Sequence, residues 1–184
     1  VHETPELRDA YNAMLPVVTE FFTRLGADER LYAKYKAIDA ASLNAEQQQA
    51  LKNSLLGFVL GGAELVGAAK ERYAQIQERM AELMQKFSEN ALDATDNWAY
   101  YASNDEMAGI PADVVQAARA AAQADGKEGH KLTLKIPSYL PVMQFAQSSA
   151  LRQKLYTAYN TRASEQAQGD GTQYDNSAVM TEIL

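Results

Sequence analysis

A long amphipathic pattern in the middle of the chain constrains the fold most. Apolar or small residues recur there at alternating steps of four and three, at Ala69, Tyr73, Ile76, Met80, Leu83, Phe87 and Ala91. An α-helix has about 3.6 residues per turn, so this spacing places them on one face and predicts a helix over residues 68–94. Because the repeat lasts barely three heptads, we expect it to pack against neighbouring helices rather than form a coiled coil.

The start of the chain predicts a second long amphipathic helix. Thr4 stands at an N-cap position and Pro5 at the first helical position, where its missing amide is tolerated. Apolar residues then follow at helical spacing up to Gly26, at Leu7, Tyr11, Met14, Val18, Phe22 and Leu25. Pro16 lies inside this helix and predicts a kink, because it removes one backbone donor.

Start and stop signals divide the rest of the chain into shorter helices. They predict helices over residues 28–40, 44–60, 110–124, 139–146, 149–162 and 175–184. Asn44 and Gln47 have the spacing of a capping box, and Ser138 and either Ser148 or Ser149 stand at N-cap positions. The composition is typical of a folded protein, because hydrophobic residues make up 47% of the chain.

Two short segments predict strands. Residues 98–102 are rich in aromatic side chains, and residues 131–136 alternate strictly between polar and apolar until Pro137. A two-stranded sheet needs backing from helices to be stable. The predicted fold class is therefore mainly α, a multi-helix lobe with one small two-stranded β element at about 98–102 and 131–136.

Charge and cysteine content exclude several classes of function. The formal net charge is −7 and the pI is about 4.9, which disfavours binding to nucleic acid or to anionic membrane surfaces. The chain has no cysteine, which excludes disulfides, thiolate metal sites and a cysteine nucleophile and agrees with a cytoplasmic location. The most apolar stretch, residues 55–69, is too short to span a bilayer and contains Glu64.

The two ends lead us to expect a piece of a longer protein. The chain begins with Val1 rather than Met, and its last seven residues start a helix that stops without a cap. We therefore interpret residues 1–184 as a single helical fragment whose chemistry lies elsewhere.

The residues that could carry chemistry are few. His2 and His130 lie far apart, without carboxylates at metal-ligand spacing, and a surface or hairpin role is favoured for His130 over catalysis. Asp93 and Asp96 could pair as an acid and a base, but no pocket signal accompanies them, and the end of a helix explains them better. We predict no catalytic, cofactor-binding or metal-ligating residue in this chain.

Glycine-containing motifs predict turns and close packing. Asp125-Gly126 and Gly169-Asp170-Gly171 lack the further carboxylates that a calcium loop requires, so we predict turns. The G-x-x-x-G spacing of Gly57 and Gly61 lies outside a membrane span and predicts a helix end or close packing.

Aromatic residues concentrate in the second half of the chain and could either stack on a ligand or pack in the core. Their strand and helix spacing favours the core. They are Trp98, Tyr100, Tyr101, Tyr139, Tyr156 and Tyr159.

Several longer strings resemble a known family. They are Arg72-Tyr73 before Ile76, Phe87-Ser88-Glu89-Asn90-Ala91-Leu92-Asp93-Ala94-Thr95 with Trp98, Ile136-Pro137-Ser138-Tyr139-Leu140-Pro141-Val142-Met143, Leu151-Arg152, Thr161-Arg162-Ala163-Ser164 and Asp175-Asn176-Ser177. In this order they resemble the stretch upstream of the catalytic half in the thimet oligopeptidase family of zinc metalloendopeptidases. Weaker agreement reaches back to Pro5-Glu6-Leu7-Arg8, so the resemblance covers nearly the whole chain.

The resemblance implies a parent enzyme with most of its machinery outside this chain. Members of the family are large, mostly helical hydrolases in which two lobes flank a deep channel that admits short, unfolded peptides. This segment would belong to the non-catalytic N-terminal lobe and wall the channel. The family binds Zn²⁺ through an H-E-x-x-H helix, whose glutamate activates water, and this motif does not occur in residues 1–184.

Three hypotheses follow. The first is a cytoplasmic zinc oligopeptidase that degrades short peptides, of which this chain is an inactive helical segment partnered by the catalytic lobe. The second is a free-standing helical peptide-binding or scaffold module without catalysis. The third, which we place last, is a helical enzyme that uses its own carboxylates.

Overall fold

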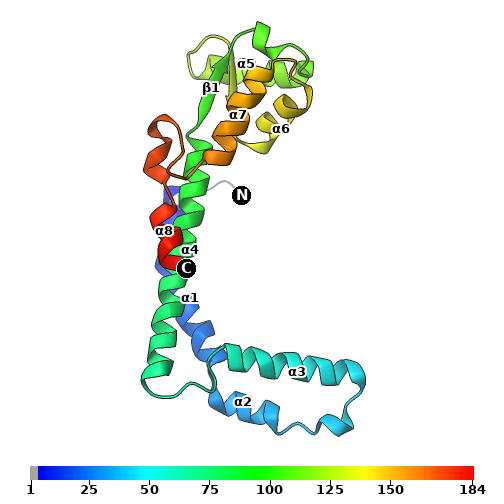
Figure 1. Cartoon of the computed structure of the whole chain (residues 1–184), viewed down its shortest axis with the longest axis vertical. Coiled ribbons are helices and arrows are strands. Elements are labelled where there is room, and N and C mark those ends of the chain that lie inside the picture. The colour runs from blue at the N-terminus through cyan, green and yellow to red at the C-terminus, as the bar shows by residue number, and fades with distance from the viewer. Residues whose placement is uncertain (1–3) are drawn as a thin grey trace. The chain divides into compact units, whose positions relative to one another are not determined.

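The computed structural model describes residues 4–184, which form helices and one small antiparallel sheet (Figure 1). The chain is mainly α-helical, as predicted. Its longer elements are α1 (Pro5–Gly26), α2 (Glu29–Lys36), α3 (Ala45–Leu60), α4 (Ala68–Asp96), β1 (Ala99–Ala102), α5 (Ala112–Ala124), β2 (His130–Thr133), α6 (Ile136–Phe145), α7 (Ser149–Thr161) and α8 (Ser177–Ile183). The chain divides into two compact units between Met84 and Gln85, so α4 begins in the first unit and ends in the second.

The helices of the first unit begin where their capping residues predict. The Thr4 hydroxyl accepts the amide of Leu7 at 3.3 Å, and the Asp28 carboxylate accepts the amides of Arg30 and Leu31 at 2.9 Å. The capping box before α3 is also confirmed, because Asn44 and Gln47 bond to each other's backbone amides at 2.9 and 3.0 Å. The helix predicted over residues 28–40 is shorter than expected, since a separate 3₁₀ turn occupies residues 40–42.

The first unit buries very little apolar surface among its described residues. Its buried hydrophobic residues are Ala27, Ala63 and Leu83. Helix α1 continues through Pro16 and has no buried residue, although its sequence is strongly amphipathic. The six apolar residues that define its predicted face are between 43% and 62% exposed. The amphipathic pattern therefore predicts the helix correctly, but its apolar face is uncovered.

A close approach of two glycines joins the end of α1 to the end of α3. A Cβ built on Gly61 would lie 2.9 Å from the carbonyl oxygen of Gly26 and 3.1 Å from that of Gly57. Gly61 has φ of −75°, so the space around it, and not its backbone conformation, requires glycine. The close-packing interpretation of the G-x-x-x-G spacing is confirmed.

The second unit contains the small sheet. Strands β1 and β2 are antiparallel, and their register pairs Ala99 with Thr133 and Ala102 with His130. The predicted strand over 131–136 is too long, because β1 has four residues and offers no partner beyond Thr133. Leu134 and Lys135 bend away, and the next helix begins at Ile136.

Pro137 and Ser138 therefore have different roles from those predicted. Pro137 stands in the first turn of α6, where a proline needs no amide partner, so it opens a helix rather than ending a strand. Ser138 lies inside that helix, and its hydroxyl accepts the amide of Thr133 at 2.9 Å instead of capping. The predictions that Pro137 ends the strand and that Ser138 caps the helix rested on residue pattern alone, and both are wrong.

The core of the second unit lies between the sheet and helices α5, α6 and α7. Its fully buried residues of largest volume include Leu132, Leu151, Leu155 and Val142. Helix α5 runs close to β2 because it presents small side chains there, and Ala118 and Ala122 are 7% and 0% exposed. Figure 1 shows α6 and α7 next to one another and next to the sheet.

A buried amide pair links the loop before α8 to α4. Asn90 donates its side-chain amide to Asn176 at 2.8 Å, and Asn176 donates to the carbonyl of Phe87 at 3.1 Å. Both asparagines are buried, at 6% and 3% exposure. Asn176 therefore does not cap α8 with its side chain, whereas the predicted short helix itself forms from Ser177 to Ile183. Leu184 after it is 97% exposed.

Across residues 4–184, every helix is too short or too polar to cross a lipid bilayer.

Candidate functional site

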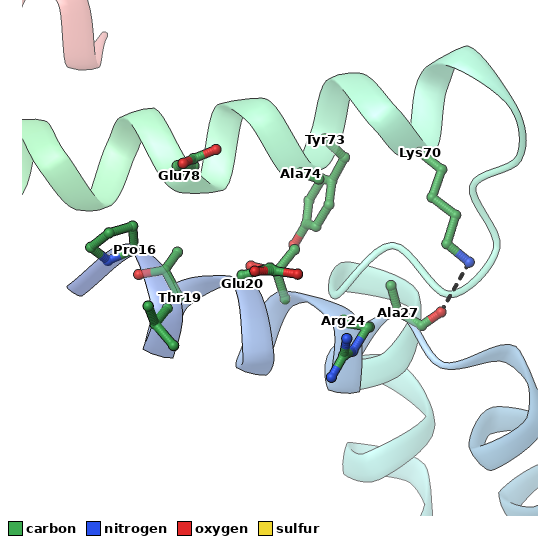
Figure 2. Close-up of a pocket in the computed structure, with 11 residues that line it drawn as sticks. Pro16, Thr19, Glu20, Arg24, Ala27, Lys70, Tyr73, Ala74 and Glu78 are labelled. Atoms are coloured by element: carbon green, nitrogen blue, oxygen red, sulfur yellow. Dashed lines mark hydrogen bonds between the residues drawn. The ribbon is translucent and has the colours of Figure 1, made fainter. Parts of the chain in front are cut away.

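The candidate binding site is a cavity of about 380 Å³ in the first unit, between α1 and the first turns of α4 (Figure 2). It is framed by Pro16, Val17, Thr19, Glu20, Thr23, Arg24 and Ala27 on the α1 side and by Lys70, Tyr73, Ala74 and Glu78 on the α4 side. Tyr73 lies between the two helices in Figure 2, and the Lys70 side chain reaches towards Ala27.

Two hydrogen-bonded side chains of α4 set the width of the cavity. Lys70 donates to the carbonyl of Ala27 at 3.1 Å and to the Glu29 carboxylate at 2.7 Å. Tyr73 donates its hydroxyl to the carbonyl of Leu60 at 3.0 Å, at the end of α3. These hydrogen bonds connect α4 to the ends of α1 and α3 through side chains. The cavity lies between α1 and α4.

The cavity has the character of a binding surface. Its lining combines the carboxylates of Glu20 and Glu78 and the cations of Arg24 and Lys70 with apolar side chains such as Val17. The described residues that line it include no histidine, cysteine or serine. A cavity that combines apolar side chains with a few charged groups is typical of a binding site.

Of the two histidine candidates, the structure describes His130. His2 lies outside the described residues. His130 is the first residue of β2 and only 1% exposed, and α5 separates β2 from β1 in the chain, so both predicted roles, surface or hairpin, are wrong. Its Nδ1 lies 3.4 Å from the carbonyl oxygen of Ala102, and its Nε2 has no hydrogen-bond partner. The alternation of strand β2 explains its burial, since His130 shares a face with Leu132.

The paired aspartates at the end of α4 have a structural role. Asp96 forms an ion pair with Lys135 at 3.1 Å, and the backbone carbonyl of Asp93 accepts the Asn97 side-chain amide at 2.9 Å. These contacts hold the helix end next to the segment that follows β2, in agreement with the interpretation of Asp93 and Asp96 as a helix end.

The aromatic residues mostly pack against the core, as predicted. Trp98, Tyr100 and Tyr139 are partly buried against it, and Tyr139 stacks on Tyr159 with ring centroids 4.3 Å apart. Burial raises the pKa of the Tyr139 hydroxyl above its ordinary value. Tyr101 is not among the residues packed against this core, and Tyr156 is 56% exposed.

The turn at Asp125 is held by charge. Its carboxylate lies 2.6 Å from the Lys131 ammonium and accepts the Tyr101 hydroxyl at 2.6 Å. The hydrogen bond from Lys131, followed by that from Tyr101, lowers the pKa of the Asp125 carboxyl. Gly126 has φ of +68°, which confirms the predicted turn.

Zinc does not fit the described residues. In the range from Thr4 to Leu184, three or more histidine, cysteine, aspartate or glutamate side chains never come close enough together to hold a metal ion. No catalytic step through a metal can be derived from this part of the chain, and the expectation that the ligands lie elsewhere stays a prediction.

Comparison with known proteins decides the relationship. No family model matches the chain. It is, however, 43% identical over 189 residues to oligopeptidase A of Salmonella typhimurium and to oligopeptidase A of Escherichia coli. The chain is homologous to part of oligopeptidase A. It is also 36% identical over 199 residues to a protein of Arabidopsis thaliana named probable cytosolic oligopeptidase A.

The extent of the match is as informative as its identity. Each of these alignments covers 100% of this chain, which confirms the resemblance inferred from the signature strings. The chain spans 28% of the length of the two bacterial oligopeptidase A relatives and 27% of the plant one. Most of each relative therefore has no counterpart in residues 1–184.

Proposed function

We propose that this chain is a non-catalytic, N-terminal helical segment of an oligopeptidase A-like zinc metalloendopeptidase that hydrolyses short peptides in the cytoplasm. The observation that carries the proposal is the 43% identity to oligopeptidase A along the whole chain. Identity of this size over 189 residues is far more specific than any single motif in the sequence.

The contribution of this segment is to bind and shape, and not to react. Its cavity between α1 and α4 is lined by charged and apolar side chains, and its described lining residues include no histidine, cysteine or serine. We infer that the segment forms part of the wall of a channel that admits short, unfolded peptides. The zinc ligands and the water-activating glutamate then belong to the polypeptide outside residues 1–184.

A second candidate function is a free-standing helical module that binds peptides without cleaving them. The cavity of about 380 Å³ favours it, because a pocket of this size can hold a peptide side chain. The coding sequence separates the two candidates. An H-E-x-x-H motif downstream of Leu184 in the same reading frame supports the peptidase, and a frame that closes without one supports the module.

The experiment that tests the proposal compares the full-length protein with the segment of residues 1–184 on short, unstructured peptides. We expect cleavage by the full-length protein and none by the segment. Cleavage of the peptides by the segment alone would contradict the proposed division of roles. Cleavage of folded proteins by the full-length protein as readily as short peptides would contradict it as well.

A further inference from the structure

Helix α1 has one face that borders the cavity and another, apolar face that the structure leaves exposed. Its apolar residues form a three-heptad repeat, with Leu7, Met14 and Phe21 at one position of the heptad and Tyr11, Val18 and Leu25 at the other. All six side chains are between 43% and 54% exposed. The residues of α1 that line the cavity beside α4, such as Pro16, Glu20 and Thr23, lie on the opposite face, since a helix turns by about 100° per residue.

The apolar face is also wide. Leu15 and Phe22 flank the stripe on one side and Ala10 and Val17 on the other, and Phe22 and Val17 are 62% and 55% exposed. Soluble proteins rarely leave a continuous apolar surface of this length in water. A face broader than a two-helix seam is typical of a helix that packs inside a bundle.

We propose that this face of α1, which we call the α1 stripe (Leu7, Tyr11, Met14, Val18, Phe21 and Leu25), docks an amphipathic helix of the same polypeptide from outside residues 1–184. The heptad spacing indicates a helical partner, because side chains repeating every seven residues form one row of knobs for another helix. We assign this partner helix to the same polypeptide. The bacterial relatives are homologous to this chain along its whole length, and the chain spans 28% of their length.

This inference rests on the proposed function, because that proposal supplies the polypeptide outside residues 1–184. Its test measures contacts of the α1 stripe and not peptidase activity. In the full-length protein, Phe21 or Met14 is replaced by the photo-crosslinking residue p-benzoylphenylalanine. Ala13 serves as the matched control because it is exposed, neighbours Met14 and lies off the stripe. The substitution at Phe21 is more conservative than that at Met14, because one aromatic side chain replaces another.

The crosslinked partner is identified by mass spectrometry, with the tryptic peptide of residues 9–24 as the bait. We expect Phe21 and Met14 to crosslink within one molecule to a segment outside residues 1–184, and Ala13 not to do so. Crosslinks between differently labelled copies, to an added substrate peptide, or solely within residues 1–184 would each overturn the inference.

Cysteine labelling gives a second, independent measurement. Residues 1–184 contain no cysteine, so a label on peptide 9–24 reports only the introduced residue. We expect Met14→Cys in the full-length protein to react at least about tenfold more slowly than Ala13→Cys, because a covered thiol reacts only on local opening. Equal rates would overturn the inference. Peptidase activity of the unmodified full-length protein is measured in parallel. An active peptidase in which the α1 stripe is uncovered would contradict the docking inference and leave the proposed function intact.

Discussion

At the scale of single residues, Gly61 determines how closely α3 approaches α1. A Cβ there would lie 2.9 Å from the Gly26 carbonyl oxygen, whereas a Cβ on Gly57 would meet nothing within 4 Å. We expect Gly61→Ala to lower the free energy of unfolding of the first unit by about 1–3 kcal/mol, the usual range for overpacking. The control Gly57→Ala is expected to raise it by about 0.5–1 kcal/mol, because alanine favours the helix.

Hydrogen–deuterium exchange of the amides in α1 and α3 measures both variants, since it reports the free energy of local opening. Faster exchange in Gly61→Ala together with unchanged or slower exchange in Gly57→Ala is the predicted result. Equal behaviour of the two variants would mean that the glycine contact does not hold the two helices together.

Asp125 is expected to make the second unit sensitive to acid. Its ion pair with Lys131 and its hydrogen bond from Tyr101 hold the carboxyl pKa below the ordinary value of 3.8. A carboxyl whose pKa is lower in the folded state stabilises that state above its ordinary pKa, and the contribution is lost as the pH falls through the folded pKa. The stabilisation is therefore present at neutral pH and disappears in acid.

We predict that Asp125→Asn unfolds at lower temperature than the unchanged protein at neutral pH and that this difference shrinks as the pH falls below 3.8. Fluorescence of Trp98, the single tryptophan of the chain, follows the second unit. Asp170→Asn in an exposed 3₁₀ turn is the control and should show no comparable pH dependence. A difference for Asp125→Asn that grows in acid would contradict the assignment.

At the scale of elements, two asparagines link the start of α8 to α4. Asn176→Ala removes the acceptor of the buried Asn90 amide and the donor to the Phe87 carbonyl. Leaving buried polar groups without partners costs about 1–3 kcal/mol, so the variant should lose about that much stability. Asn160→Ala, which removes an exposed amide bonded to the Tyr156 carbonyl, should lose much less. Thermal unfolding of the two variants measures the difference, and equal losses would rule out a special role for the pair.

Helix starts could be predicted from the sequence because caps are local. Thr4, Asp28, Asn44 and Ser148 each bond to an amide two or three residues away, so a few neighbouring residues contain the information. The end of β2 could not be predicted in this way. Alternation continues to Ile136, but a strand also needs a partner, and β1 pairs only as far as Thr133.

The site was harder to predict than the elements. The helical spacing of α1 indicates an apolar face but not whether the chain covers it, and the structure leaves it exposed. The cavity joins residues 16–27 to residues 70–78, a contact that no local pattern contains. His130 could have been placed by the alternation of its strand, because buried Leu132 follows it by two residues.

At the scale of the whole molecule, the two units differ in how well they cover their own apolar residues. The second unit has a core of fully buried side chains that includes Leu132, Leu151 and Leu155. The first unit buries little beyond small residues and Leu83, and most of its large apolar side chains on α1 remain exposed. This contrast agrees with the proposal that the first unit is completed by polypeptide outside residues 1–184.

The central claim is that this chain is a segment of a zinc-dependent peptidase. The most direct test is the rate at which the purified full-length protein hydrolyses a short peptide before chelation, after removal of metal by a chelator, and after zinc is added back. We predict that hydrolysis is lost on chelation and returns with zinc. A full-length protein that cleaves no peptide with zinc present, or whose hydrolysis persists after complete removal of metal, would contradict the claim.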